Sequence, residues 1–286
     1  MNIHNLRNSI EDIKNMYETA ITTATFGGKE YPNGLEAKTA LIRSEQLIQK
    51  IHEEVKVSLD NKLKEEGFSG YEIHPPIGQP SPELDVWGFL KKKKQDIVVL
   101  FENPVSEEIT EGPLMGKIDK LGKDATEKSI VIGVRSQLSS IDKNFDTLME
   151  RAFAEAMNLH FRHPRLVVGE VYMLIVREYD DQAMKQNRVD FKNKYTNVEK
   201  FISIFNGISH RECNECTDPH SFYKYEATAL LLVDFSQSPV KLYTTIEELK
   251  EDGIVSENFN EDYSLISPLG FTDRIIRSYK HRHGFE

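Results

Sequence analysis

The chain has 286 residues, of which 29% are charged and 39% are hydrophobic, and its formal net charge is −10 at pH 7. A chain of this length can bury most of its unfolded surface as one large domain or two unequal ones. It has no uninterrupted apolar stretch of bilayer length, and its N-terminus lacks the apolar segment of a secretory signal. We therefore expect a cytoplasmic protein with no membrane partner. The negative charge argues against indiscriminate coating of nucleic acid but allows a local basic cleft.

The first third of the chain changes from helical to extended patterns. Apolar residues spaced by three and four predict an amphipathic helix over residues 3–20 and a long helix over about 35–63. Several prolines then exclude a helix. The segments LDVWGFL (84–90) and DIVVLF (96–101) predict two strands joined by a KKKKQ turn. Residues 103–128 are polar and predict a long loop or a small subdomain.

Two unbroken apolar runs, SIVIGV (129–134) and RLVVGEVYMLIV (165–176), predict strands buried on both faces. The residues between them predict a helix that is capped near Asp142 or Asn144 and ended by Pro164. Beyond residue 180, the pattern predicts a helix over 198–205, a strand over 227–235 and a short helix over 244–253. This order predicts an α/β fold with a mixed central sheet flanked by helices. We expect residues 1–180 to form the core with the N-terminal helices, and residues 181–286 to complete the sheet.

Polar residues at the ends of these strands predict a divalent-metal site. Asp96 stands where the chain enters a buried strand, so its carboxylate can reach a cleft while the next residues stay packed. Arg135 and Gln137 share one face of the next buried strand and can polarise a phosphate and a water. On the following helix, Glu150 and Glu155 lie about 140° apart, so we expect only one of them, Glu150, to face the site. Two or three carboxylates suffice for Mg²⁺, which keeps several waters.

With these residues, the segment from about 36 to 176 resembles the PD-(D/E)XK superfamily of type II restriction endonucleases in architecture and site logic. In that family, an acid on one strand and an acid-x-lysine on the next bind Mg²⁺, often with a glutamate from an N-terminal helix. The resemblance implies that Asp96, Glu150 and Glu36 are the metal-linked acids and that Gln137 replaces the lysine. At the expected acid-x-lysine, the chain has Gly-Val-Arg or Arg-Ser-Gln, without a carboxylate and without lysine.

The predicted function is Mg²⁺-dependent, sequence-specific cleavage of double-stranded DNA. Cutting both strands of a palindrome requires two sites related by a two-fold axis, which implies a homodimer. The resemblance alone implies a companion DNA methyltransferase. One alternative is a catalytically inactive nucleic-acid-binding or regulatory protein on the same fold, favoured by the missing lysine. Another is a zinc-loop interaction module without a nucleic-acid role, favoured by the acidic charge.

Other residues define alternative or additional sites. Asp85 and Glu102, on adjacent strands of the predicted hairpin, are a second choice for the metal site. Two basic groups are candidate DNA contacts: Lys92, Lys93 and Lys94 in the hairpin turn, and Arg274, Arg277 and Lys280 near the C-terminus. The motif HxxCxxCxxxH offers four ligands for a structural Zn²⁺: His210, Cys213, Cys216 and His220.

Overall fold

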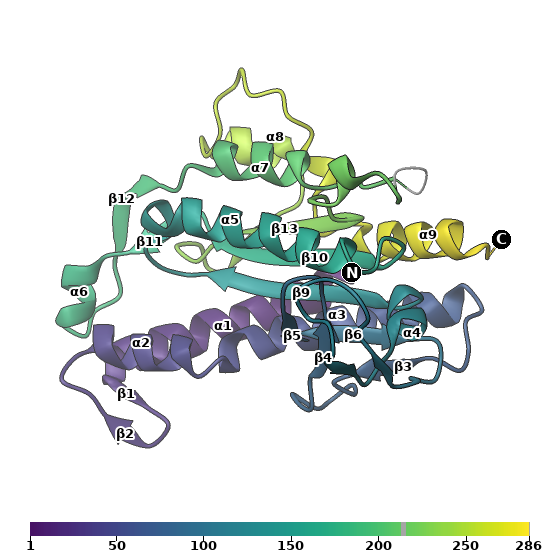
Figure 1. The fold of residues 1–286 in the computed structure, drawn as a ribbon. Coiled ribbons are helices and arrows are strands. Elements are labelled where there is room, and N and C mark those ends of the chain that lie inside the picture. The colour runs from purple at the N-terminus through teal and green to yellow at the C-terminus, as the bar shows by residue number, and fades with distance from the viewer. Residues whose placement is uncertain (213–215, 286) are drawn as a thin grey trace.

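The computed structural model describes residues 1–212 and 216–285, and its centre is a six-stranded sheet (Figure 1). The strand order is β14-β13-β10-β9-β6-β3. The bounds of these strands are Lys241–Tyr243 (β14), Ala227–Asp234 (β13), Val167–Ile175 (β10), Ile130–Gln137 (β9), Ile97–Leu100 (β6) and Glu72–His74 (β3). Strands β9, β10 and β13 are parallel, whereas β3, β6 and β14 pair antiparallel with their neighbours. The predicted α/β fold with a mixed central sheet is confirmed.

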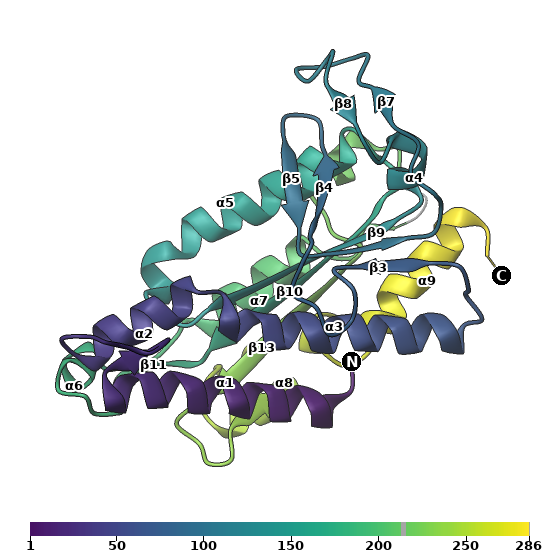
Figure 2. The same cartoon turned by 90° about the horizontal axis from the view of Figure 1, so that it is seen from below.

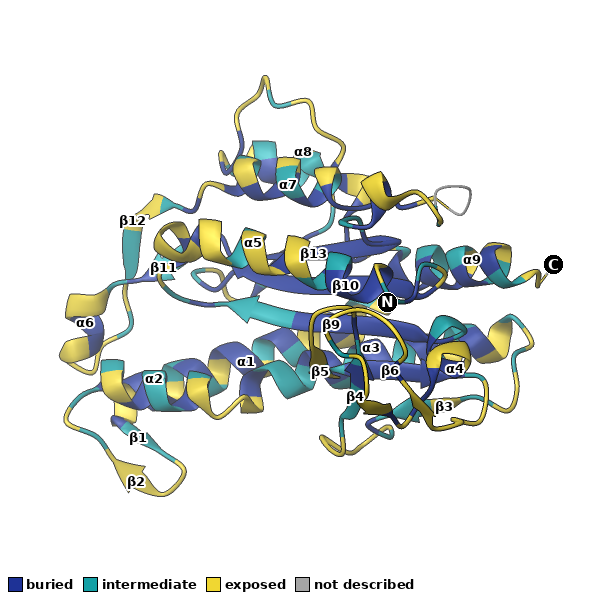
Figure 3. Cartoon of the chain, in the orientation of Figure 1, coloured by how far each residue is buried: buried dark blue, intermediate teal, exposed yellow. Residues whose placement is uncertain are grey.

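Helices cover both faces of the sheet (Figures 1 and 3). On one face lie α1 (Ile3–Thr23), α2 (Gly34–Arg43), α3 (Gln46–Glu65) and α9 (Phe271–His283), and on the other lie α5 (Ile141–His160) and α7 (Val198–Gly207). Strand β9 shows why both faces are apolar. Ile130 and Ile132 pack in the same core cluster as residues of α1 and α3, whereas Val131 packs with Ala152 and Ala156 of α5. Every residue of β10 and β13 is buried, as expected for central strands covered on both sides.

Short elements lie around this core. They are the helices α4 (Lys123–Glu127), α6 (Asp181–Lys185) and α8 (Ile246–Glu251), and the two-stranded pairs β1–β2 (Thr25–Phe26, Lys29–Glu30), β4–β5 (Leu84–Trp87, Lys92–Gln95), β7–β8 (Glu107–Glu108, Ile118–Asp119) and β11–β12 (Arg177–Tyr179, Phe191–Tyr195). The segment 103–128 therefore holds a small hairpin and a helix. Within the described residues, no helix combines the length and apolarity that crossing a membrane requires.

The structure corrects two predicted elements near the site. The helix expected over 35–63 is two helices, because Glu45 adopts a left-handed backbone conformation (φ 63°) that redirects the chain between α2 and α3. The predicted KKKKQ turn is also wrong, because Lys92–Gln95 is itself a strand. It pairs with β4, and the chain turns at residues 88–91 instead. Strand β6 joins the central sheet separately, between β3 and β9.

The N-terminus of α5 is stabilised from outside the helix. Its N-cap is Ser140, whose side chain makes no capping bond, rather than Asp142 or Asn144. The carboxylate of Glu178 instead accepts hydrogen bonds from the backbone N–H groups of Ser140 (3.2 Å) and Ile141 (2.9 Å). A carboxylate at this end also interacts favourably with the helix dipole. Local capping rules missed it because Glu178 is distant in sequence.

Candidate active site

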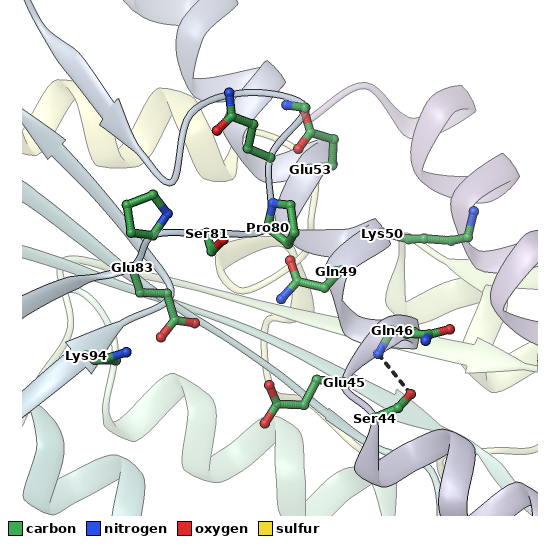
Figure 4. A pocket seen from close by; sticks show the side chains of 13 residues that line it. Ser44, Glu45, Gln46, Gln49, Lys50, Glu53, Pro80, Ser81, Glu83 and Lys94 are labelled. Atoms are coloured by element: carbon green, nitrogen blue, oxygen red, sulfur yellow. Dashed lines mark hydrogen bonds between the residues drawn. The ribbon is translucent and has the colours of Figure 1, made fainter. Parts of the chain in front are cut away.

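A pocket of about 800 Å³ lies between the start of α3, the segment 78–83 and the hairpin β4–β5 (Figure 4). One wall is formed by residues 44–53, the opposite wall by residues 78–83, and Lys94 of β5 closes one end. The buried Lys56 of α3 fixes the second wall by donating hydrogen bonds to the carbonyls of Pro76 (3.0 Å) and Gln79 (2.9 Å). The carboxylate of Glu53 also accepts a hydrogen bond from the backbone N–H of Gly78 (2.6 Å). The segment that carries Glu83 is therefore held against α3.

Glu45 and Glu83 point toward one another from opposite walls of this pocket (Figure 4). Within the described residues, neither carboxylate has a hydrogen bond or ion pair. Glu45 also holds an unfavourable backbone conformation for a residue other than glycine. Such strain often marks functional positions. The break between α2 and α3 and the strained backbone of Glu45 thus place the Glu45 carboxylate at the pocket.

Asp96 lies next to Glu83 at the base of the hairpin. Leu84 pairs with Gln95, so Glu83 and Asp96 stand at the same end of the β4–β5 ladder. The Oδ2 atom of Asp96 accepts a hydrogen bond from the backbone N–H of Val134 (2.7 Å), where β9 extends past β6. Its other carboxylate oxygen makes no hydrogen bond within the described residues. One oxygen positions the side chain and the other is left for a ligand.

Burial and neighbouring charges shift the pKa values of Glu83 and His52. Burial raises the pKa of Glu83, and the nearby Asp96 and Glu45 raise it further, against the opposing effect of Lys94. On the α3 side, burial lowers the pKa of His52, although Asp96 opposes this. His52 is 5% exposed, and its buried Nε2 atom has no hydrogen-bond partner in the described part of the chain. Asp96 and Glu45 therefore both act on Glu83, with only partial compensation from Lys94.

These donors fit a Mg²⁺ ion. Mg²⁺ prefers oxygen ligands and is commonly held by one or two carboxylates together with waters and substrate phosphates. A cation there would relieve the repulsion that raises the pKa of Glu83. Across residues 1–212 and 216–285, no three His, Cys, Asp or Glu side chains are grouped closely enough to hold a metal on their own. A Mg²⁺ ion at this pocket would therefore need further ligands, such as waters and substrate phosphates.

The structure changes the choice of metal-linked acids. Glu150 is exposed on α5, whereas Glu155 faces inward and forms ion pairs with Arg135 and Lys93. The preference for Glu150 over Glu155 is therefore wrong. Glu36 lies in the first turn of α2, exposed, where it accepts a hydrogen bond from Asn33 (3.3 Å). Glu45 and Glu53 are the glutamates that the N-terminal helical segment brings to the pocket, and Glu53 is already bonded to the N–H of Gly78.

Arg135 and Gln137 are engaged within the protein. Arg135 lies between Glu155 and Glu170, with 3.4 Å between its Nε and the Glu170 Oε1. Two carboxylates thus compensate its charge, and this geometry does not support the predicted contact with phosphate. Gln137 donates to the carbonyl of Ser139. It lies three residues beyond Val134, roughly 10 Å along the strand, so the structure does not bring it to Asp96.

The second-choice pair does not come together. Asp85 is on β4 and pairs with Lys92 (2.7 Å), whereas Glu102 follows the far end of β6 and pairs with Lys128 (2.7 Å). The expectation failed because β4 pairs with β5 and not with β6. Of the predicted basic residues in the hairpin, Lys92 and Lys93 are in ion pairs, and Lys94 is exposed at the pocket.

The basic residues of α9 have mixed surroundings. Arg274 donates to the carbonyls of Leu269 (2.9 Å) and Ser267 (2.8 Å), which gives it a structural role at the start of the helix. Lys280 pairs with Glu66 of α3 (2.8 Å). Arg277 is exposed, and its contact with DNA stays a prediction.

The predicted zinc motif is only partly described. Cys213 lies outside the described residues, so the four-ligand prediction stays a prediction. His210 and Cys216 are half-buried and His220 is exposed. Burial and the neighbouring Arg274 and Lys224 lower the pKa of His210.

Sequence reasoning missed Glu45, Glu83 and His52. Glu83 precedes the predicted strand directly, in the segment SPELD, and could have been found as an acid at a strand entry, like Asp96. Glu45 and His52 lie inside a continuous helical pattern that hides the break. The chain matches no protein-family model, no curated protein and no solved structure, so the evidence for this site is its own geometry.

Proposed function

We propose that the protein is a Mg²⁺-dependent, sequence-specific endonuclease that hydrolyses double-stranded DNA, with its active site at Glu45, Glu83, Lys94 and Asp96. The observation that carries the proposal is that Glu45 and Glu83 face each other across a pocket that also presents Lys94, with Asp96 close enough to Glu83 to raise its pKa. The mixed sheet flanked by helices agrees with the resemblance to type II restriction endonucleases. A homodimer and a companion methyltransferase belong to the same proposal.

Each residue has a role that its surroundings support. Bound Mg²⁺ would supply Lewis-acid stabilisation of charge on the phosphate. Asp96 and Glu45 would hold the ion, with Asp96 oriented by the N–H of Val134. Glu83 would accept a proton from the attacking water, because burial, the largest cause of its raised pKa, would still act on it beside a bound ion. Lys94 would neutralise charge on the phosphate from the hairpin side.

Cleavage of unmethylated phage DNA with Mg²⁺ tests this proposal. We expect discrete fragments from the wild type and none from Glu83→Gln or Asp96→Asn. Both variants keep the shape of the side chain, and the amide oxygen introduced by Asp96→Asn can still accept the bond from the N–H of Val134. Glu150→Gln and Glu36→Gln, which remove exposed acids, are matched controls and should cleave like the wild type. Fragments from Glu83→Gln would place the chemistry elsewhere.

A catalytically inactive nucleic-acid-binding protein is the second candidate. It is favoured by the finding that, among the described residues, no three His, Cys, Asp or Glu side chains are grouped closely enough to hold a catalytic metal on their own. Intact DNA in every buffer and with every divalent metal, together with a measurable shift of labelled duplex in a gel, would support this candidate over the nuclease.

A further inference from the structure

The hairpin β4–β5 carries Lys94 and is bounded by Glu83 and Asp96, yet it lies outside the six-stranded sheet (Figure 2). Its strands bond only to each other, so other contacts must set its position. At the tip, Asn158 of α5 accepts from the N–H groups of Leu90 (2.8 Å) and Lys91 (3.1 Å) and donates to the carbonyl of Lys91 (3.1 Å). The tip is therefore fixed to the C-terminal half of α5.

Nearer the base of the hairpin, Lys93 makes the contact with α5. Its side chain points to the face opposite Lys94 and pairs with Glu155, whose side chain is only 12% exposed. Glu155 also pairs with Arg135 of β9, and Arg135 faces Glu170 of β10, which is 1% exposed. A series of contacting ionisable side chains thus runs from the middle of the sheet to the hairpin in the order Glu170, Arg135, Glu155, Lys93.

Glu155 is the link between the sheet and the hairpin in this series. Burial opposes its ionisation, but Arg135 and Lys93 hold its pKa below the ordinary value. Burying charged side chains carries a large desolvation penalty, so such a network adds little to the free energy of folding. Its best supported role is to select one conformation over competing ones. Here the arrangement that it fixes is the position of the strand that carries Lys94 and leads into Asp96.

We propose that Glu155 is a positioning residue of the active site, which holds the hairpin β4–β5 through Lys93 so that Glu83, Lys94 and Asp96 converge on the pocket. The proposal rests on the proposed function. Glu155 does not touch the substrate; it acts through the hairpin. Misplacing a reacting group by about 1 Å costs roughly 100-fold in rate. We therefore expect Glu155→Gln to lower kcat by about 10- to 100-fold and to leave KM for DNA within about two-fold.

The sole tryptophan gives a readout that does not need activity. Trp87 is on β4, its carbonyl accepts from His163, which follows α5 (2.8 Å), and Lys92 lies over its ring. In the β4–β5 ladder, Trp87 follows Val86, the residue that pairs with Lys93, so loss of the Lys93 contact should loosen the packing around this ring. Acrylamide should therefore quench Trp87 more strongly in Glu155→Gln than in the wild type. Lys93→Met should behave in the same way while leaving Arg135 with both of its carboxylates, which separates loss of the tether from damage to the core.

Glu66→Gln is the matched control, because Glu66 also bridges two cations from different elements, Lys62 (3.0 Å) and Lys280 (2.8 Å), away from the hairpin. It should leave both quenching and kcat at the wild-type level. If the wild type cleaves DNA and both tether variants keep its kcat, or if their quenching is unchanged, the inference is overturned. If the wild type cleaves no DNA but the tether variants show increased quenching, the proposed function fails while the tether to the hairpin stands.

Discussion

Glu170 provides a test of the buried charges beneath α5 through the pH dependence of stability. Its carboxyl lies in the middle of β10, 1% exposed, between Gly133 of β9 and Thr228 of β13. Burial raises the pKa of Glu170 from 4.5 to about 7, with further contributions from Glu155 and Asp96, although Arg135 opposes the shift. Its Oε1 atom has no hydrogen-bond partner within the described residues.

The sign of the effect follows from this shift. Between pH 4.5 and about 7, the folded protein keeps a proton on Glu170 that the unfolded chain has lost. Stability therefore falls as the pH rises through this window, and the loss is complete above it. At 1.36 kcal/mol per pKa unit, the loss is about 3 kcal/mol. With roughly 2.1 cal/mol/K of unfolding entropy per residue, this corresponds to about 5 °C in Tm.

Glu170→Gln removes the titration and keeps the shape of the side chain. The stability of the variant relative to the wild type should improve by about 3 kcal/mol between pH 5 and pH 8, whatever the offset at pH 5. Urea unfolding of both proteins at half-unit pH steps measures this difference, and Glu150→Gln controls for the loss of one negative charge. A relative stability that is constant within about 0.5 kcal/mol over the range would refute the argument, since Glu170 would then titrate alike in both states.

Three further substitutions test the supports of the fold and the pocket. Glu226→Ala removes the buried carboxylate shared by Arg211 and Arg282 and should cost about 3–5 kcal/mol in urea unfolding; a loss under about 1 kcal/mol would contradict its role. Gly133→Ala places a Cβ 2.3 Å from the Glu170 carboxylate and should cost about 1–3 kcal/mol by the same method, whereas a neutral result would show that Glu170 moves freely. Lys56→Met removes the bonds to the second pocket wall. Hydrogen exchange at the Gly78 amide should become about 10-fold faster or more, which corresponds to about 1.4 kcal/mol in the free energy of local opening. Unchanged exchange would mean that other contacts hold the wall.

The sequence predicted the parts of the fold that depend on regular patterns of apolar residues. The helices α1 and α5 could be recognised because their apolar residues repeat at the helical period, and the strands β9, β10 and β13 because their apolar runs are unbroken. Asp96 could be recognised because an acid at the entrance to a buried strand is unusual. The break at Glu45 could not, since α2 and α3 each continue an amphipathic pattern and the chain has no glycine or proline between them.

The remaining errors concern pairings between distant segments. LDVWGFL and DIVVLF both have the sequence pattern of strands. The lysines between them, however, form the strand that pairs with LDVWGFL, and contacts with α5 hold this pairing in place. The choice of Glu150 over Glu155 failed for a related reason. Both glutamates suit a helix surface, and only the positions of Arg135 and Lys93 show that Glu155 faces inward.

Metal-directed cleavage of the polypeptide tests most directly whether a divalent ion binds at this pocket. Fe²⁺ in place of Mg²⁺, with ascorbate and peroxide, produces radicals that cut the backbone next to the bound ion, and mass spectrometry locates the cuts. We predict cuts near Glu45, near Glu83 and between Lys94 and Asp96, suppressed by excess Mg²⁺ and lost in Glu83→Gln. Cuts confined to the exposed face of α5 around Glu150, or to the segment around His210, would contradict the account.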